Sequence, residues 1–275
     1  MRFLPILPLL LLAPGLAQAG ERCAHSAPRQ LQLDLAGVKT LRLETGPHTV
    51  RVQAAPGAAH ALRGRACASR ADWLPELTVT QEKRDGTLVV RVRREKQSAL
   101  SGLLGETYAY LDLAGTVPDH VLVQLVVGSG DVHASGAAAL SADVGSGDVH
   151  VRGVRGPVTA KVGSGDLEID GAGTLKVLSI GSGDVQARSI GGAVEVGSIG
   201  SGDFVLQGAR GDVRIGSIGS GDAGLEDVAG AVRVGSIGSG EVEVAGAAAL
   251  AVDAIGSGDV SHRGVTGPVE LPRKN

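Results

Sequence analysis

The feature that most constrains this 275-residue chain is a four-residue motif that recurs at an almost constant interval. Gly-Ser-Gly-Asp, with Glu in place of Asp once, occurs eight times, and successive acidic residues are 17 to 19 positions apart. A period of this length without helical spacing inside it is typical of a β-solenoid, in which each repeat forms one turn and packs on the next. The acidic positions are Asp131, Asp148, Asp166, Asp184, Asp203, Asp222, Glu241 and Asp259.

Each repeat contains two short stretches that alternate apolar and polar residues, separated by glycine turns. This pattern predicts two strands per rung, and stacking the rungs places equivalent apolar residues in inward columns. Bulky Phe204 would then lie beside small Ala223, as close packing in an interior of constant width requires. One column is Val132, Val149, Leu167, Val185, Phe204, Ala223, Val242 and Val260. Another is Val127, Val144, Val162, Ile180, Ile199, Ile218, Ile237 and Ile255.

Charged residues at the outward positions support the same register. In one column Arg152, Asp170 and Arg188 follow one another, and in a second the order is Lys176, Glu195, Arg214. Opposite charges in lateral contact between strands stabilise a sheet by about 0.2–1 kcal/mol per pair. We therefore expect neighbouring residues in these columns to attract one another.

The chain divides by composition near residue 126, because 33 of its 43 glycines lie between Gly128 and Gly267. We expect residues 127–275 to form the regular solenoid. Residues 20–126 would form a less regular β-rich region that caps the stack or adds imperfect rungs, with a hairpin turn at Asp85-Gly86. The alanine-rich segment 54–70 is expected to hold an irregular turn or a short helix. The predicted fold class is all-β, a single-chain parallel β-helix.

The N-terminus has the organisation of a secretory signal peptide. Arg2 gives a positive start, an apolar run follows to Leu16, and Ala17-Gln18-Ala19 is a small-x-small cleavage site. We expect residues 1–19 to be removed, so that the mature chain begins at Gly20 and is periplasmic, extracellular or on the cell surface. The apolar run is shorter than the 20 or so residues of a membrane span, so no membrane span is expected.

The chain has two cysteines, Cys23 and Cys67. In an oxidising compartment an isolated pair is expected to form one disulfide, and closing a loop of this length would stabilise the fold by about 3–4 kcal/mol. Two free buried thiols are the alternative. A zinc site is not expected, because no further ligands lie near either sulfur in the sequence.

Composition excludes a strongly basic nucleic-acid-binding protein. Lys and Arg number 26 against 29 Asp and Glu, so the broad positive surface that phosphates require is missing. The chain has only two Phe, two Tyr and one Trp, which predicts a thin aliphatic core. We expect no nucleic-acid partner.

The repeated Gly-Ser-Gly-Asp-Val rungs, preceded by residues 38–43 and 110–118, resemble a bacterial family of β-strand-repeat proteins, the "putative adhesin" family. This family is related to the head domains of autotransporter adhesins, and the resemblance extends from about residue 30 to the end of the chain. It implies a β-helical envelope protein without established catalytic residues.

The eight acids could be taken for functional residues. A catalytic residue, however, occupies a unique environment in a protein, whereas these acids occupy equivalent positions in eight successive repeats. We interpret them as structural turn residues, with Gly supplying positive φ and Asp bonding nearby backbone N–H groups. Calcium binding is the alternative, although calcium needs six to eight oxygen ligands and each rung offers one acid. A transition-metal site formed by His133, His150 and Glu168 on adjacent rungs is a further alternative.

The sequence thus predicts no catalytic, cofactor-binding or metal-binding residue and no cofactor. The leading hypothesis is a non-enzymatic exported solenoid that acts as an adhesin-like or structural envelope protein, with an unknown envelope or surface component as its partner. The alternative is a polysaccharide-acting β-helix enzyme with its site in the N-terminal half. Asp72, Trp73 and Glu76 are the candidate residues for that site.

Overall fold

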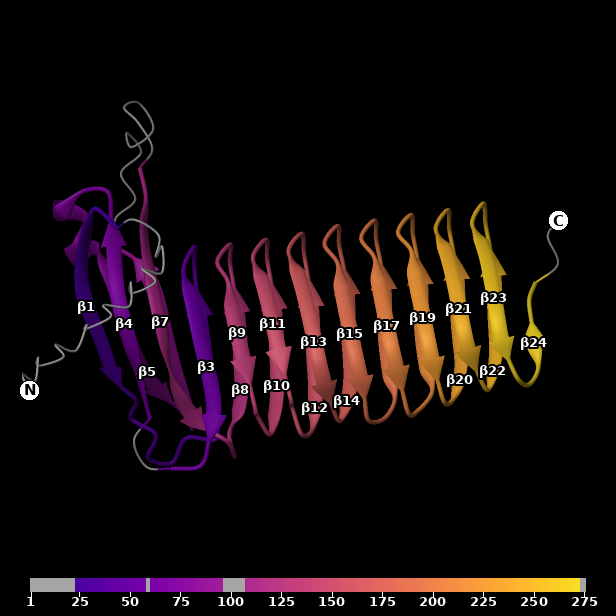
Figure 1. Cartoon of the computed structure of the whole chain (residues 1–275), viewed down its shortest axis with the longest axis horizontal. Coiled ribbons are helices and arrows are strands. Elements are labelled where there is room, and N and C mark those ends of the chain that lie inside the picture. Colours follow the sequence, from indigo (N-terminus) through magenta and orange to yellow (C-terminus); the bar gives the residue numbers. More distant parts are fainter. Residues whose placement is uncertain (1–22, 58–59, 96–106, 273–275) are drawn as a thin grey trace, which may run out of the picture.

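The computed structural model describes residues 23–57, 60–95 and 107–272, and it confirms the β-solenoid. The chain winds through about eight turns of about 19 residues, and each turn contributes one strand to each of two facing sheets. Figure 1 shows the rungs side by side along the long axis, with the N-terminal strands at one end and β24 at the other. A short 3-10 helix, η1 (Ala71–Glu76), is the one helix of the described residues.

The two sheets contain twelve strands each. Sheet A contains, in spatial order, β1 (His25–Gln32), β4 (Ala61–Ala68), β7 (Ala109–Pro118), β3 (Thr49–Ala55), β9 (Val132–Ser135), β11 (Asp148–Arg152), β13 (Asp166–Ala172), β15 (Val185–Ile190), β17 (Phe204–Ala209), β19 (Ala223–Val228), β21 (Glu241–Ala247) and β23 (Asp259–Val265). Sheet B contains, from the opposite end, β24 (Val269–Glu270), β22 (Ala249–Ile255), β20 (Ala231–Ile237), β18 (Val213–Ile218), β16 (Val194–Ile199), β14 (Thr174–Ile180), β12 (Pro157–Val162), β10 (Ala139–Val144), β8 (Leu122–Val127), β2 (Thr40–Thr45), β6 (Thr87–Arg94) and β5 (Leu77–Arg84).

The inward columns expected from the repeat are the core of the molecule. Phe204 pairs with Ala223 across β17 and β19, and both are buried. Ile199, Ile218 and Ile237 pair successively in sheet B and are each no more than 3% exposed. The register is therefore as predicted, and every rung buries its apolar face against the rungs beside it.

The N-terminal rungs stack out of chain order. The β2–β3 rung pairs in parallel with the β8–β9 rung on one side and with the β6–β7 rung on the other. Figure 1 shows β3 between β7 and β9. The solenoid register therefore continues across residue 126, and β6 and β7 form an additional rung on the outer side of the first one.

Antiparallel strands close the N-terminal end of both sheets. In sheet A, β1 and β4 follow β7, and in sheet B, β5 forms a hairpin with β6 through Asp85 and Gly86 at positive φ. The expected hairpin is confirmed. Segment 54–70 contains an irregular bend at residues 56 and 57, as one alternative expected, but the short helix of the other alternative is wrong, because residues 61–68 form β4. That segment is held as a strand by tertiary pairing on both of its sides.

The predicted disulfide is present. Cys23 is bonded to Cys67 of β4, with 5.6 Å between their Cα atoms. The bond joins the residue that precedes β1 to the neighbouring strand, so it fastens the terminal strand of sheet A.

The second glycine of each tetrad is required by close stacking of the rungs. A Cβ atom on Gly202 would overlap the carbonyl oxygen of Gly183 in the preceding rung, and Gly183 is placed in the same way against Gly165. The expectation that tetrad glycines supply positive φ is therefore wrong, since none of them has a positive φ. The left-handed residues lie instead at the opposite turn, once per rung, and they are Gly136, Gly153, Gly171, Ser189, Gly208, Asp227, Gly246 and Gly264.

Candidate functional site

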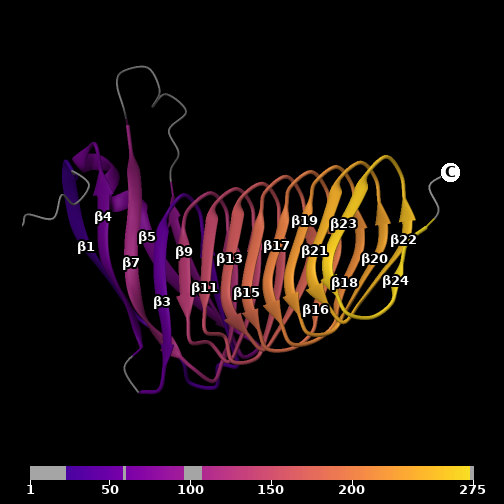
Figure 2. The ribbon, with the colours of Figure 1, turned by 45° about the vertical axis from the view of Figure 1, so that its right-hand side comes forward.

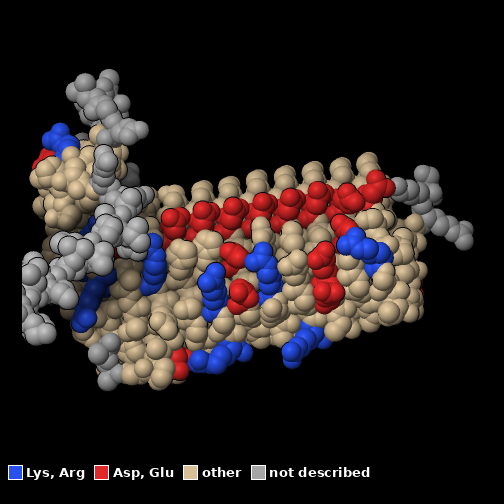
Figure 3. Space-filling view, viewed as in Figure 1, with Lys and Arg blue, Asp and Glu red and all other residues tan. Residues whose placement is uncertain are grey.

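The eight acidic residues form a continuous ridge along one edge of the solenoid, visible as the red row in Figure 3. Within the ridge, four carboxylates, those of Asp166, Asp184, Asp203 and Asp222, accept a hydrogen bond from the backbone of the next rung. The backbone N–H of Asp203 donates to Oδ1 of Asp184 at 2.9 Å, and the N–H of Asp222 donates to Oδ1 of Asp203 at 2.9 Å. The ladder runs from Asp166 to the N–H of Glu241. These charge-assisted bonds join successive rungs and offset the repulsion between stacked carboxylates.

The ladder ends where Glu241 replaces Asp. Its longer side chain lies 3.5 Å from Ser261 Oγ, and the N–H of Asp259 donates to the carbonyl of Gly240 instead. In the part of the chain that the structure describes, no group of three or more His, Cys, Asp or Glu side chains is arranged to hold a metal ion.

A recess of about 720 Å³ lies on the outer face of sheet A, where β7, β3, β9, β11 and β13 run side by side. Small residues on these strands form the floor of the recess, and charged or imidazole side chains form its border. Period-two alternation brings them to one face, because their intervening neighbours point into the core. The recess is lined by Arg51, Val52, Gln53, Ala114, Gly115, Thr116, His133, Ala134, Ser135, His150, Arg152 and Glu168.

The structure brings together the three residues that the sequence placed on adjacent rungs. The His133 and His150 rings are stacked, with centroids 4.7 Å apart and planes 7° from parallel. His150 Nδ1 lies 2.9 Å from Glu168 Oε2 and must donate, because an ionised carboxylate only accepts. Arg188 Nη1 donates to the other oxygen of Glu168 at 2.9 Å. The two bonds leave Glu168 fully engaged at the end of the recess.

These contacts change the ionisation of the site. Burial, followed by repulsion from His150, lowers the pKa of His133. The hydrogen bond from His150 holds the pKa of Glu168 below its usual range. At neutral pH the recess therefore presents a neutral His133 ring beside the guanidinium groups of Arg51 and Arg152.

The outward charge columns are in the predicted register, but only one of them forms the expected contact. Lys176 Nζ lies 3.0 Å from Glu195 in the next rung. In the other column Arg188 pairs with Glu168 rather than with its lateral neighbour Asp170. A diagonal neighbour on a sheet is within reach of a long side chain, so register alone did not determine this partner.

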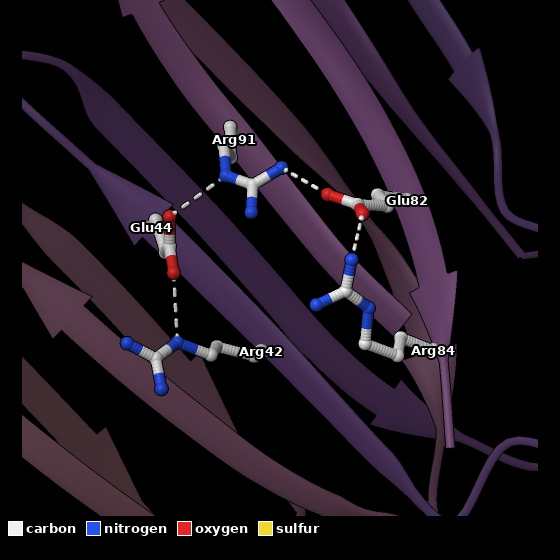
Figure 4. A network of polar contacts seen from close by, with 5 residues as sticks. All are labelled: Arg42, Glu44, Glu82, Arg84 and Arg91. Carbon is white, nitrogen blue, oxygen red and sulfur yellow. Dashed lines mark hydrogen bonds and ion pairs between the residues drawn. The ribbon is translucent and has the colours of Figure 1, made fainter. Parts of the chain in front are cut away.

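A network of ion pairs crosses the N-terminal end of sheet B. Glu44 of β2 bonds both Arg42 and Arg91, and Glu82 of β5 bonds both Arg91 and Arg84. Figure 4 shows that these five side chains form one connected chain across three strands. The pKa of Glu82 is lowered by its hydrogen bond to Arg91. The network joins the first solenoid rung to the closing hairpin.

The residues of the enzymatic alternative are engaged in structural contacts. Asp72 pairs with Arg70 at 2.9 Å, and Glu76 pairs with Arg94 at 2.8 Å. Trp73 is buried, and the guanidinium carbon of Arg94 lies 4.2 Å from the centroid of its ring. A tryptophan covered in this way stabilises η1 against β6 through a cation–π contact.

Sequence reasoning missed two buried histidines, His48 and His60, of which His48 is the more deeply buried. Thr45 aligns with Val127 in the sheet, so Gly46-Pro47-His48-Thr49 occupies the place of a Gly-Ser-Gly-Asp tetrad. His48 is 1% exposed, and its Nδ1 accepts a hydrogen bond from the N–H of Leu111 at 3.3 Å. Burial lowers its pKa to about 4. The alternation of residues 41–45 and 50–52 around this turn was the signal that could have identified the degenerate tetrad.

Two family models match the chain. The model described as "Putative auto-transporter adhesin, head GIN domain" matches residues 158–265, and the model described as "Toastrack DUF4097" matches residues 38–210. No curated protein matches the chain. Among the described residues there is no helix long and apolar enough to cross a membrane.

Solved structures share the fold at low sequence identity. A "putative adhesin" of Parabacteroides merdae is 13% identical, with a TM-score of 0.52, and the match covers 87% of this chain and 97% of that one. A "putative lipid binding protein" of Parabacteroides distasonis is 15% identical, with a TM-score of 0.53 and coverage of 86% and 96%. The resemblance to adhesin-related β-repeat proteins is confirmed, and since the Toastrack model spans more than half of its length, the chain belongs to the Toastrack DUF4097 family.

Proposed function

We propose that this protein is an exported, non-enzymatic solenoid that binds a component of the cell envelope or cell surface, in the manner of an adhesin. The observation that carries the proposal is the recess on sheet A. Its lining comes from five paired strands, so the ladder of backbone hydrogen bonds holds its side chains in place before any ligand arrives. A preformed hollow with a few convergent polar groups is the usual form of a binding site.

The proposed location is the periplasm or the cell surface. The Cys23–Cys67 bond supports it, because disulfides persist in oxidising compartments. The proposed signal peptide, residues 1–19, and the proposed mature terminus at Gly20 lie outside the described residues. We also retain the division into a β-rich region, 20–126, and a regular solenoid, 127–275, as a proposal about architecture.

Two further considerations support a binding role. The adhesin description of the family model that matches residues 158–265, and of the Parabacteroides merdae protein, agrees with it. The carboxylates of the enzymatic alternative, Asp72 and Glu76, each have an arginine partner. For the eight ridge acids we propose a structural role, supported by the carboxylate-to-amide bonds between rungs.

The test is co-sedimentation of the purified mature protein with washed envelope fragments from the source bacterium, together with assays for cleavage of a panel of polysaccharides. We expect saturable sedimentation with the fragments and no release of reducing ends. Asp72→Asn and Glu76→Gln serve as the control for the enzymatic alternative. Failure to associate with any fragment, or cleavage that these substitutions abolish, would contradict the proposal.

A further inference from the structure

A row of outward basic residues crosses the N-terminal part of sheet A and passes over the recess. Register places Arg63 of β4 beside Ala114 of β7, Ala114 beside Arg51 of β3, Arg51 beside His133 of β9, and His133 beside His150 of β11. Since neighbouring strands are about 4.8 Å apart, the row is about 20 Å long. Two more arginines flank it two residues along the same strands, Arg65 on β4 and Arg152 on β11. We call these six basic residues the basic row.

Three arginines of the basic row form no ion pair within the described protein, although the register places Asp112 beside Arg65 and Asp170 beside Arg152. Among the described residues, Arg63, Arg65 and Arg152 take part in no ion pair, and Arg51 has a single partner, Asp112, at 2.6 Å. The arginines of the sheet B network differ, because Arg42, Arg84 and Arg91 are each bonded to a glutamate. Figure 3 shows the contrast along this face. Lys and Arg predominate below the ridge toward the N-terminal end, whereas both signs of charge are mixed farther along.

The recess lies between the side chains of the basic row. Ala114, Gly115 and Ser135 carry little or no side chain, so the face is hollowed between the basic groups. A Cβ on Gly115 would overlap the carbonyl oxygen of Ala61 on β4. The close approach of β4 and β7 therefore excludes a larger residue at that position. An extended ligand could lie in the hollow and contact Arg51, His133 and Arg152 at once.

The acidic ridge limits the width of the ligand. Asp131 and Asp148 lie two residues before His133 and His150, which puts them in the adjacent outward column of the same face. Negative charge along this border repels any anion wider than the row, such as a nucleic-acid duplex or a lipid surface. Among the described residues, the large exposed apolar side chains are Leu178, Val205, Val269 and Leu271, and none of them belongs to the strands that carry the row. The geometry favours a single narrow chain with regularly spaced negative charges.

We infer that the basic row binds a linear anionic polysaccharide through its carboxylate or phosphate groups. Arginine forks match both groups in bidentate geometry, and the neutral His133 ring, stacked on His150, can donate to or accept from sugar hydroxyls. The inference rests on the proposed binding function and gives its ligand class. The charged polymer would lie along the solenoid axis, in the same direction as the row.

The experiment is titration calorimetry of the full mature protein with four probes: alginate, a glycerol-phosphate teichoic acid, neutral dextran and duplex DNA. We expect binding to alginate or the teichoic acid, whichever charged group the row accepts, and no binding to dextran or DNA. Because the attraction is electrostatic, affinity should fall by about tenfold or more between about 50 mM and 200 mM salt.

The decisive variant is the double substitution Arg63→Glu, Arg152→Glu. The matched control is Arg214→Glu on sheet B, an outward arginine that also takes part in no ion pair among the described residues. All three side chains are exposed, so circular dichroism should be unchanged. The double variant should lose about tenfold or more in affinity and reduce the slope of log affinity against log salt by about two, while the control stays within about twofold.

The outcomes separate this inference from the proposed function. Equal loss in the control, binding to neither anionic polymer, or duplex DNA binding that depends on the row would overturn the inference. If envelope fragments still sediment the wild-type protein while neither polymer binds, the ligand class is wrong and the binding function stands. If neither the fragments nor the polymers bind, both proposals fail.

Discussion

At the scale of single residues, the fold depends on glycines, which have no Cβ atom, as much as on buried apolar side chains. The second glycine of each tetrad allows successive rungs to approach until its own α-carbon lies against the carbonyl of the rung before it. The αL position at the opposite turn carries glycine in six rungs and Ser189 or Asp227 in two. His48 occupies a tetrad glycine position in the β2–β3 rung, where its ring is buried.

The stacking role of the tetrad glycine predicts a sharp difference between two Gly→Ala substitutions. Gly202→Ala places a methyl group on the carbonyl of Gly183, and the backbone shift that relieves the overlap should cost about 2–3 kcal/mol. At Gly224, on the outer face of β19, nothing lies within 4 Å of the added atom, so Gly224→Ala should be neutral or stabilising by up to about 1 kcal/mol. Urea unfolding of the two variants measures both effects. Equal stabilities would contradict the stacking role.

The positive φ required at the turn opposite the tetrads predicts that Ser189→Gly stabilises the protein. Ser189 has φ 58°, a conformation that costs an L-residue about 1–2 kcal/mol and glycine almost nothing. After the greater unfolded-state entropy of glycine is included, the gain should be about 0.5–1 kcal/mol. Ser198→Gly, within β16 and outside the positive-φ positions, is the control and should destabilise by a similar amount. Thermal unfolding should show opposite changes in Tm.

The lowered pKa of His48 predicts that the folded protein loses stability in mild acid. Its pKa is about 4 in the folded protein and about 6.5 when unfolded, so the unfolded chain binds the proton first as the pH falls. Stability should therefore decrease from pH 6.5 to about 4, by about 3 kcal/mol in all, and this contribution should change no further below pH 4. His48→Asn keeps an acceptor for the N–H of Leu111 and should remove this contribution.

The measurement is the free energy of unfolding in urea at several pH values between 7 and 4. His120→Asn is the control, because the His120 side chain is 78% exposed. The control should keep the full decrease of the wild-type protein. A decrease of the same size in His48→Asn would mean that another group is responsible.

At the scale of elements, each strand is stabilised by its neighbours in the stack. A single rung buries one apolar face and satisfies its backbone groups through the rungs on either side, as the pairing of β16, β18 and β20 illustrates. In a one-dimensional stack, damage to one rung is transmitted to the adjacent rungs. The carboxylate-to-amide ladder and the inward isoleucine column run through the same elements.

A charge inside the isoleucine column should therefore disrupt several rungs. Ile218→Asp buries a carboxylate at a position that is 2% exposed, which should cost at least about 3 kcal/mol even after the pKa of the new carboxyl rises. Arg214→Ala, four residues earlier on the same strand, removes an outward side chain and should cost no more than about 1 kcal/mol. Hydrogen exchange should show lost protection over residues 199–237 in the first variant alone. Equal tolerance of the two changes would contradict the register.

At the scale of the whole molecule, the solenoid has two unlike ends. At the C-terminal end, sheet B finishes on the two-residue strand β24, whereas sheet A finishes on the seven-residue strand β23, whose outer edge is unpaired among the described residues. The N-terminal end is closed by antiparallel strands, by the ion-pair network of Figure 4 and by the disulfide. The basic row lies next to this reinforced end, where the first rungs and the closing strands form one sheet.

The disulfide predicts local rather than global weakening on reduction. Cys23→Ser with Cys67→Ser releases the segment before β1, and the chain-entropy model gives a loss of about 3–4 kcal/mol for a loop of this length. Hydrogen exchange should rise in β1 and β4, whereas β17 and β18 near the middle of the stack should keep their protection. Alkylation of the oxidised wild-type protein should detect no free thiol. Two reactive thiols in that protein would contradict the bond.

Local pattern was sufficient wherever the chain repeats itself. The rung period, the inward columns and the strands around Asp85-Gly86 could be predicted because each depends on spacing along the sequence, and the disulfide could be predicted because the chain has only two cysteines. The adjacency of His133, His150 and Glu168 followed from the same period. Repetition turns a tertiary contact into a regular sequence interval, since every rung has its neighbour 17 to 19 residues away.

Other features depend on contacts between residues whose separation in the sequence follows no repeat, or on the exact positions of atoms, and only the tertiary structure determined these. The order of the first rungs, with β2–β3 between β6–β7 and β8–β9, joins segments whose separations differ from the repeat. β4 is a strand because β1 and β7 pair with it, and Arg188 bonds Glu168 rather than Asp170 because its side chain reaches the diagonal neighbour. The tetrad glycines show the same limit. The sequence shows that they recur in every repeat, but only the packed rungs reveal that the reason for the second glycine is a carbonyl oxygen where a Cβ would lie.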